Sequence, residues 1–253
     1  MIKGLYAAAS AMVANLTRQS TISHNIANLD TPGFKQIMVS LDDFIDTSVI
    51  FPPGDLNGAA NNQYIGNLGL GVDTAPETTN FDQGGLRETG EMLDFAIQGE
   101  GFFRVMTPNG ERYTRDGRFS RDLDGNLVTI DGYKVLDESG SEINLPDGDV
   151  TVASDGTIQV EGVDAGKIGI ASFLNPATEL SRDLPNTFSA NSAPNGEEVG
   201  TIEQGYLEMS NANSADLMTQ MVAVARAYEA AQSMVQNQDE LLSRTISTLG
   251  KYT

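Results

Sequence analysis

Few residues in this chain have the type and spacing that catalysis or metal binding requires. His24 is the single histidine, and the only acidic residue within seven positions of it is Asp30. One imidazole forms neither a catalytic triad nor a metal site by itself, so we interpret His24 as a helix-surface or packing residue. The chain has no cysteine, which excludes a disulfide framework and a cysteine–zinc site.

Two short segments suggest ligand-binding loops but do not match them. Asp122-Leu123-Asp124-Gly125-Asn126 resembles the start of a calcium loop, yet its glycine falls at the fourth position instead of the sixth. An Asp-Gly pair fits a tight hairpin turn, which we favour here. Gly99-Glu100-Gly101 lacks the third glycine of a dinucleotide fingerprint. We therefore predict no catalytic, cofactor-binding or metal site.

Charge is distributed unevenly along the chain. Its 35 acidic and 15 basic residues give a formal net charge of −20 over 253 residues, which disfavours nucleic acids and anionic membranes as partners. Residues 1–29 hold two bases and no acid, and residues 210–253 hold four acids and three bases, so the middle carries about −21. Like charge keeps the middle parts of separate copies apart, whereas the near-neutral ends can approach one another.

The sequence predicts neither membrane insertion nor a cleavable signal peptide. No apolar stretch reaches the length of a membrane span. The apolar start at residues 5–14 has no basic region before it beyond Lys3, so it does not fit a secretory signal. Classical rules then place the protein in the cytoplasm, unless it leaves by a route that uses no such signal.

Both ends of the chain carry apolar residues at alternating spacings of three and four. This is the spacing of helices that pack lengthwise against other helices, and it predicts one helix over about 2–28 and another from about 210 to 249. The pattern leaves two readings open, a helical hairpin inside one subunit or a seam between copies, and we favour assembly. The predicted seam consists of Ile2, Leu5, Ala9, Met12, Leu16 and Ile26 in the first helix and Leu217, Met221, Val224, Tyr228, Val235, Leu242 and Leu249 in the second.

The region between the helices is predicted to be β. Six Asn-Gly or Asp-Gly pairs between residues 109 and 156 are strong signals for hairpins. Residues 51–71 are rich in Gly and Asn and are expected to form a loop, and residues 175–200 are polar and turn-rich. The predicted fold class is α+β: a discontinuous, antiparallel helical coiled-coil layer from the two termini, plus a central all-β, antiparallel, sandwich- or barrel-like domain. The predicted segments are 1–30 (N-terminal helix), 31–80 (linker or extended loop), 81–209 (β domain) and 210–253 (C-terminal helix).

Several motifs resemble those of the bacterial flagellar rod and hook axial proteins. The family signature Asn-X-Ala-Asn-X-X-Thr-X-Gly-Phe/Tyr-Lys is matched between residues 25 and 35, with His24 a mild departure where the family often has Asn. The segments 205–213, 94–103 and 113–117 resemble further family elements. The segment 220–229 resembles a helix of the family, in which Ala225 stands where Gln is common. The matching positions are Asn25, Ala27, Asn28, Thr31, Gly33, Phe34, Lys35, Gly205, Tyr206, Ser210, Asn211, Arg226, Tyr228 and Glu229.

This resemblance implies a basal-body rod protein of the proximal or distal type, without enzymatic activity or cofactor. It implies self-association into a helical tube that transmits torque and passes export substrates, with the terminal helices inside and the β domain outside. The implied partners are copies of the chain, other flagellar rod, hook and ring proteins, and the flagellar type III export apparatus. The implied location is the periplasm-spanning rod, reached without signal cleavage. Length favours rod over hook, and residues 51–71 with the Arg226 helix favour the distal type. The alternatives are a hook-type axial protein and a non-flagellar coiled-coil assembly or adhesion protein.

Overall fold

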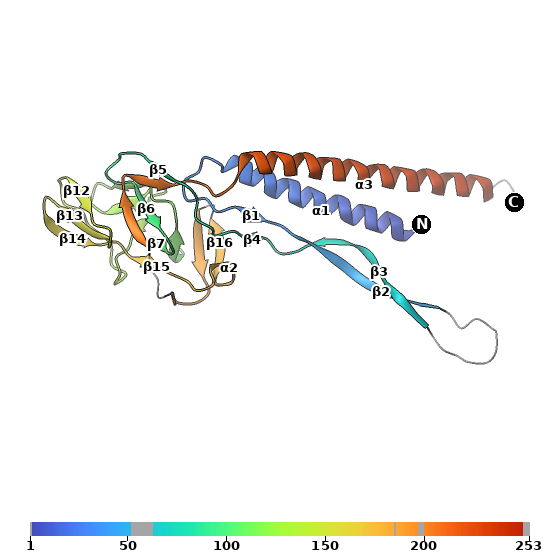
Figure 1. Cartoon of the computed structure of the whole chain (residues 1–253), viewed down its shortest axis with the longest axis horizontal. Helices are drawn as coiled ribbons and strands as arrows, with labels where there is room; N and C mark the ends of the chain where they lie inside the picture. The colour runs from blue at the N-terminus through green and yellow to red at the C-terminus, as the bar shows by residue number, and fades with distance from the viewer. Residues whose placement is uncertain (1, 52–62, 185, 197–199, 250–253) are drawn as a thin grey trace. The chain divides into compact units, whose positions relative to one another are not determined.

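The chain folds into two compact units, each built from segments that are distant in sequence. The computed structural model describes residues 2–51, 63–184, 186–196 and 200–249, with the side chains of residues 2, 3 and 249 and most of those in residues 44–70 left out. Unit 1 contains Met1–His24, Ile37–Thr78 and Ala215–Thr253, and unit 2 contains Asn25–Gln36 and Thr79–Ser214. Figure 1 shows the course of the chain through these segments.

Two long helices dominate unit 1, as the sequence predicts. Helix α1 spans Ile2–Ala27 and helix α3 spans Ser214–Leu249. The two helices lie close together at Gly4 of α1. A Cβ atom added to Gly4 would lie 3.6 Å from Nε2 of Gln238 in α3. The α+β fold class is confirmed in this respect, and regular coiled-coil packing between the helices stays a prediction.

A long β ribbon completes unit 1. Strands β2 (Leu41–Phe51) and β3 (Gln63–Thr74) pair in antiparallel register as a two-stranded sheet (Figure 1). The prediction of a loop was therefore wrong for residues 63–71, while residues 52–62 lie outside the described part. The physical reason is that the ladder satisfies the backbone groups of a Gly- and Asn-rich strand whose own β propensity is low. The short strands β1 (Ile37–Met38) and β4 (Thr78–Thr79) pair beside it.

The main sheet of unit 2 is antiparallel throughout, as the hairpin signals predict. Its order is β16-β17-β8-β7-β11-β10-β9, and β15 also pairs with β7. The strands β16 and β17 fall within residues 175–200, a polar, turn-rich region in which the sequence predicts no strand. The bounds are β7 Phe102–Thr107, β8 Gly110–Thr114, β9 Phe119–Arg121, β10 Leu127–Thr129, β11 Lys134–Val135, β15 Ile170–Ala171, β16 Leu180–Leu184 and β17 Thr187–Ala190.

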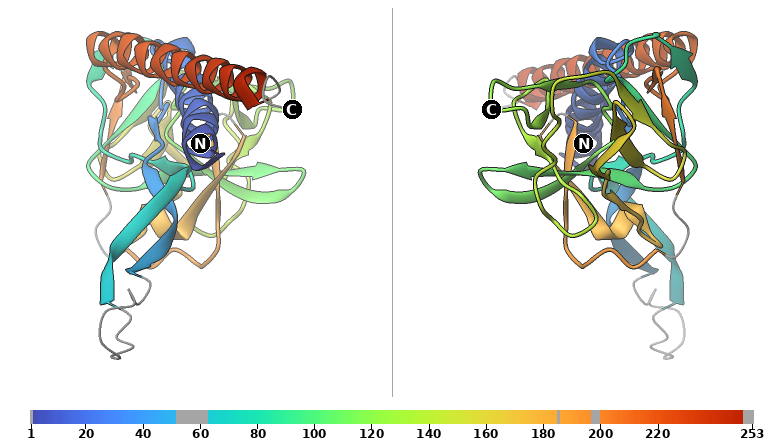
Figure 2. Two further views of the ribbon diagram at one scale, coloured as in Figure 1. Left: turned by 90° about the vertical axis from the view of Figure 1, so that its right-hand side faces the viewer. Right: turned by 90° about the vertical axis from the view of Figure 1, so that its left-hand side faces the viewer.

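Smaller ladders complete unit 2, and Figure 2 shows the ribbon from two opposite directions. One sheet has the order β12-β13-β14, β18 pairs with β6, and β19 pairs with β5. The bounds are β5 Leu86–Glu88, β6 Phe95–Gln98, β12 Val150–Val152, β13 Thr157–Val160, β14 Val163–Lys167, β18 Thr201–Gln204 and β19 Tyr206–Glu208, with a short helix α2 at Pro176–Glu179. The sandwich- or barrel-like arrangement stays a prediction.

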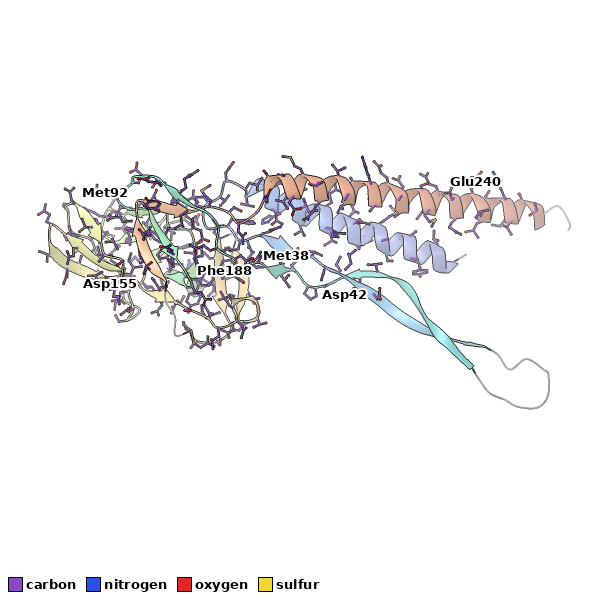
Figure 3. The ribbon with its side chains drawn as sticks, in the orientation of Figure 1. Met38, Asp42, Met92, Asp155, Phe188 and Glu240 are labelled. Carbon is purple, nitrogen blue, oxygen red and sulfur yellow. The ribbon has the colours of Figure 1, made fainter. Side chains whose placement is uncertain are left out.

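Strand β7 separates two apolar cores. Neighbouring residues in a strand point to opposite faces, and Phe103 packs into a large cluster while Phe102 packs into a smaller one. Phe188, labelled in Figure 3, lies in the smaller cluster with its ring centroid 5.9 Å from that of Phe102. Because both faces of β7 are buried, unit 2 has an extensive core of its own.

Four of the six Asn-Gly and Asp-Gly pairs lie between paired strands, with glycines 110, 125, 132 and 156 at positive φ. The turn before Gly125 is built by Asp122, whose Oδ1 accepts hydrogen bonds from the backbone N–H groups of Asp124 and Asn126. This confirms the preferred hairpin reading of that segment. Gly117 differs: a Cβ there would lie 1.6 Å from the carbonyl oxygen of Phe95, so the pair Asp116-Gly117 marks a close backbone approach.

Candidate functional site: the motif junction and the helix surfaces

The N-terminal signature leaves α1 through a tight turn. The backbone N–H of Thr31 donates to Asn28 O, and the Thr31 hydroxyl donates to Asn28 Oδ1. Gly33 follows at φ 69°, and a Cβ there would lie 2.3 Å from Asp116 N and 2.4 Å from the carbonyl carbon of Arg115. Only glycine fits both the conformation and the space. Its N–H donates to the carbonyl of Glu208 at 2.7 Å, which places the signature against strand β19.

A buried ion cluster lies directly after this turn. Lys35 Nζ is 2.6 Å from Glu208 Oε1, and Arg115 Nη1 is 2.9 Å from Glu208 Oε2. The side chains of Lys35 and Glu208 are each 1% exposed and that of Arg115 is 5% exposed. Gly84 N–H donates to the same carboxylate, and Lys35 also donates to Asp82 O. One carboxylate thus joins three separate sequence motifs.

Burial governs the electrostatics of this cluster. Loss of water lowers the pKa of Lys35 below its usual value, and the Glu208 carboxylate opposes that effect. Burial also lowers the pKa of Arg115, again opposed by Glu208. Two cations facing a single carboxylate are stable in an interior only when their remaining donors are paired. Arg115 achieves this partly through Gly99 O at 2.8 Å and the ring of Phe102, whose centroid is 5.1 Å from its guanidinium carbon.

Asn211 bridges three segments of unit 2. Its Oδ1 accepts a hydrogen bond from Gln36 N, and its Nδ2 donates to the carbonyls of Asn80 and Asp82. Unit 2 consists of the segments Asn25–Gln36 and Thr79–Ser214. Asn211 therefore connects the end of the first segment with both the start and the end of the second. A backbone bond from Asn80 N to Gln36 O closes the arrangement.

The aromatic residue of the signature is held by a second arginine. Phe34 is 1% exposed, and the guanidinium carbon of Arg182 lies 4.9 Å from its ring centroid and 5.3 Å from that of Phe188. Arg182 Nη2 also donates to the carbonyl of Lys35. Strand β16, which the sequence did not predict, thereby positions the cation that covers the motif.

We call the set Gly33, Phe34, Lys35, Arg115, Glu208 and Asn211 the motif junction. Lys35, Arg115 and Glu208 pair with one another, and this ion cluster is buried. Groups in this state can hold chain segments together, because breaking a buried pair leaves an uncompensated charge. They offer no accessible nucleophile or general base to a substrate.

Not every predicted motif residue reaches the junction. Gly205, at φ 77°, accepts hydrogen bonds from Thr89 and Gly90 on its carbonyl, and Tyr206 pairs with Glu88 between β19 and β5. Asn25 is buried and Ala27 exposed near the end of α1, and Ser210 Oγ accepts from Ala212 N. The matched positions Arg226, Tyr228 and Glu229 lie elsewhere, on α3 in unit 1, with Arg226 and Glu229 exposed.

Sequence reasoning missed three residues that organise the junction: Arg115, Arg182 and Glu208. Two of them stand within segments that resemble family elements, since Arg115 lies in 113–117 and Glu208 lies in 205–213. Each is a charged residue in a strand or directly after one. Such a residue needs a partner if it is buried, but the sequence does not say which of many charges supplies it.

The predicted seam of α1 is only partly covered in the single chain. Leu16 is 50% exposed and Ala9 is exposed, while Leu5, Met12 and Ile26 are half-buried and the side chain of Ile2 lies outside the described part. The buried positions of α1 are a different set, shifted along the helix: Ala8, Ala14, Asn15, Thr21, Ile22 and Asn25. His24 lies exposed in the last turn of the helix.

The predicted seam of α3 is covered to a greater degree. Leu217 and Val224 are 1% and 2% exposed. Met221, Tyr228, Val235 and Leu242 are half-buried, and the side chain of Leu249 lies outside the described part. The molecule therefore covers the predicted α3 seam more fully than the predicted α1 seam, where Ala9 and Leu16 are exposed.

Comparisons with known proteins match the chain along most of its length. Residues 5–35 match the model "Flagella basal body rod protein", residues 96–160 match "Flagellar hook protein FlgE/F/G D1 domain", and residues 203–248 match "Flagellar basal body rod FlgEFG protein C-terminal". The junction residues Gly33, Arg115 and Glu208 each fall inside a different one of these three matches. The geometry thus brings together the parts that define the family.

Individual relatives agree over nearly the whole chain. The flagellar basal-body rod protein FlgG of Bacillus subtilis is 33% identical, covering 98% of this chain and 99% of the relative. FlgF of Caulobacter vibrioides is 34% identical (96% and 98% covered), and FlgG of Borreliella burgdorferi is 34% identical (96% and 97% covered). The chain belongs to the flagellar basal-body rod protein family and is of the FlgF/FlgG type.

Proposed function

We propose that this chain is a structural subunit of the bacterial flagellar basal-body rod, and not an enzyme. The main support for this proposal is the alignment with rod proteins over nearly the whole chain. The residues of the N-terminal signature also make contacts within the subunit itself. In this proposal α1 and α3 form the helical core domain and residues 81–209 form the outer β domain. The subunit acts mechanically, transmitting torque in a tube that also passes export substrates.

Polymerisation would proceed through the surfaces of the two helices. Each copy that joins a polymer removes apolar helix surface from water, which contributes roughly 25 cal/mol per Å². Different surfaces that meet head to tail without closing a ring produce a helical filament. The partners in this proposal are copies of the chain, other rod, hook and ring proteins and the type III export apparatus. Among the described residues no helix is both long and apolar enough to cross a membrane.

The distal rod type remains the proposed assignment within the family. It rests on the segment 51–71 and the helix around Arg226. Sequence identity does not separate the two types, since relatives named FlgG and FlgF match at 33% and 34% identity. The hook-type and non-flagellar alternatives gain no support from these relatives.

Electron microscopy of the concentrated protein tests this function. We expect tubes or filaments from the native chain and none from Leu16→Asp, which places a charge on the exposed seam of α1. The matched control is Leu123→Asp, because Leu123 is fully exposed on a hairpin turn of unit 2 and should tolerate the same change. A discrete closed oligomer from the native chain, or normal filaments from Leu16→Asp, would contradict the proposal. Leu217→Asp is also expected to block assembly, but Leu217 is buried and its loss would disturb folding as well.

A further inference from the structure

A hollow lies between α1 and β3 within unit 1. It has a volume of about 330 Å³ and is lined by Tyr6, Ala9, Ser10, Val13 and Ala14 of α1 and by Val72, Asp73 and Thr74 of β3. Tyr6 and Val13 stand seven residues apart and are 68% and 65% exposed. Helical residues at this spacing share one face, so the hollow has an exposed apolar rim two turns long.

The walls of this hollow are fixed by hydrogen bonds. Val72 N–H donates to the Ser10 hydroxyl at 3.1 Å, and that hydroxyl donates to Ala7 O. Farther along α1, the Thr21 hydroxyl donates to Glu77 Oε1 at 3.2 Å. The small side chains of Ala9 and Ala14 leave the space between the walls open. The hollow is therefore preformed and does not require a ligand to create it.

Helix α3 carries an apolar stripe that its predicted seam does not use. Met234 and Leu241 are 56% and 52% exposed and stand seven residues apart, the same separation as Tyr6 and Val13. The stripe continues toward the start of the helix through exposed alanines at 223, 227 and 230. We call these five residues the outer stripe of α3. Methionine adapts its shape to irregular apolar surfaces, which suits it to enter a hollow.

Formal charge favours contact between α1 and α3 over contact between like helices. Helix α1 has two bases and no acid, giving +2, and α3 has four acids and two bases, giving −2. The rest of the chain has 11 bases and 31 acids and carries the whole net charge of −20. The two helices of an α1–α3 contact between copies are thus neutral in sum, and Asp73 of β3 adds one negative charge to the hollow. Contacts between two α1 or two α3 helices instead bring like charge together along both helices.

We propose that the hollow between α1 and β3 of one copy receives the outer stripe of α3 from a second copy. An amphipathic helix lying with its apolar face in an apolar groove is a recurrent mode of recognition. The two surfaces differ, so each bound copy still presents one free hollow and one free stripe, and the contact propagates. This inference rests on the proposed function and specifies which surfaces carry the polymerisation.

Two complementary variants test it in the full-length protein. Val13→Asp places a carboxylate in the hollow, and the double variant Met234→Asp/Leu241→Asp places two in the outer stripe. Val163→Asp is the matched control, because Val163 is 69% exposed on strand β14 of unit 2. By analytical ultracentrifugation we expect native and Val163→Asp chains to form large polymers, and each of the other two proteins to remain monomeric alone.

Mixing the two broken proteins separates the possible outcomes. One variant keeps the stripe and the other keeps the hollow, so an equimolar mixture should form heterodimers and stop there. Polymers from Val13→Asp alone, or no pairing in the mixture, would overturn the hollow–stripe contact. Native chains that stay monomeric at every concentration would instead overturn the proposed polymerisation itself.

Disulfide trapping gives a test that adds no charge. The chain has no cysteine, so Val13→Cys on one copy and Met234→Cys on another can pair only with each other or with their own kind. We expect the mixed pair to cross-link faster by at least tenfold than Val13→Cys mixed with Asp239→Cys, a control that is exposed on the same helix outside the outer stripe. Equal rates would reject the proposed contact.

Discussion

The motif junction of unit 2 and the helix surfaces of unit 1 show opposite fates for residues that stand out in the sequence. Lys35 and Glu208 at the junction are each 1% exposed, and their polar atoms meet partners inside the same unit. Tyr6 and Val13 on α1 are apolar yet 68% and 65% exposed. Buried charge and exposed apolar surface both cost free energy, but only the first cost is offset within the chain. The signature thus serves the internal structure of the subunit, and the exposed apolar surface of unit 1 supports the proposal that its helices serve assembly.

The largest predicted effect comes from removing the shared carboxylate. Glu208→Ala leaves Lys35 and Arg115 buried without an anion, and we expect it to destabilise unit 2 by about 3–5 kcal/mol. Urea unfolding followed by tyrosine fluorescence measures this change. Glu88→Ala is the control, since Glu88 is exposed on the neighbouring strand β5 and its loss should cost no more than about 0.5 kcal/mol. Equal stability of the two variants would show that the junction does not hold unit 2 together.

The next effect isolates the close approach at the turn. Gly33→Ala combines an unfavourable positive φ with a clash against the backbone of residues 115 and 116, and we expect a loss of about 2–4 kcal/mol. Gly90→Ala has a similar φ of 75° but meets nothing within 4 Å. It should therefore cost only about 1 kcal/mol. The difference between the urea midpoints of the two variants measures the free-energy cost of the clash at Gly33. Identical midpoints would mean that the close approach at Gly33 does not affect stability.

Much of this architecture was predictable because it follows from local patterns. The helices α1 and α3 follow from their apolar spacing, and the hairpins at glycines 110, 125, 132 and 156 follow from turn chemistry. The comparisons confirmed the family resemblance, and each of its motifs is a short run of neighbouring residues. These features share one property: the interactions that specify them involve residues near each other in the chain.

What escaped prediction depends on distant partners. The contact between Lys35 and Glu208 joins residues 173 positions apart, and no local pattern pairs them. A loop is predicted for residues 63–71 because a Gly- and Asn-rich stretch has little to bury and much backbone entropy to lose, and the pairing of β3 with β2 overrides that expectation. Gly117 was read as a hairpin turn, although Phe95 presses against it from another strand. The heptad spacing also did not predict which face of each helix is buried within the chain. It therefore did not distinguish the covered face of α3 from its outer stripe.

A smaller effect appears at alkaline pH in the second core of unit 2. Burial and the nearby Glu111 carboxylate raise the pKa of Tyr113 from 10.0 to about 12. The unfolded chain therefore loses this proton first, so the contribution of Tyr113 to stability is complete below pH 10 and falls by up to about 1.4 kcal/mol per pH unit between pH 10 and about 12. Tyr113→Phe should remove that slope.

Urea unfolding of both proteins across this pH range measures the effect. The pKa of Lys35 is lowered in the folded protein, so Lys35 contributes stability that increases as pH rises toward 10.5. Both proteins contain Lys35, so this contribution cancels when the stability of one is subtracted from that of the other. Parallel stability curves for Tyr113→Phe and the native protein would mean that Tyr113 is not buried as described.

The smallest effect should come from the charged surface of α3. Arg244 and Glu240 form an ion pair one helical turn apart, with side chains 74% and 61% exposed (Figure 3 labels Glu240). Water and salt screen such pairs, so Arg244→Ala should change the stability of the monomer by less than about 0.5 kcal/mol. Arg244 follows Leu241 by three residues and lies on the same face of α3, but it is not one of the five apolar residues of the outer stripe. Its effect on assembly should therefore be slight if apolar burial carries the contact. Sedimentation of Arg244→Ala beside Leu241→Asp separates the charged contribution of this face of α3 from its apolar contribution. If Arg244→Ala blocked polymers as fully as Leu241→Asp, charge pairing would replace apolar burial as the basis of the contact.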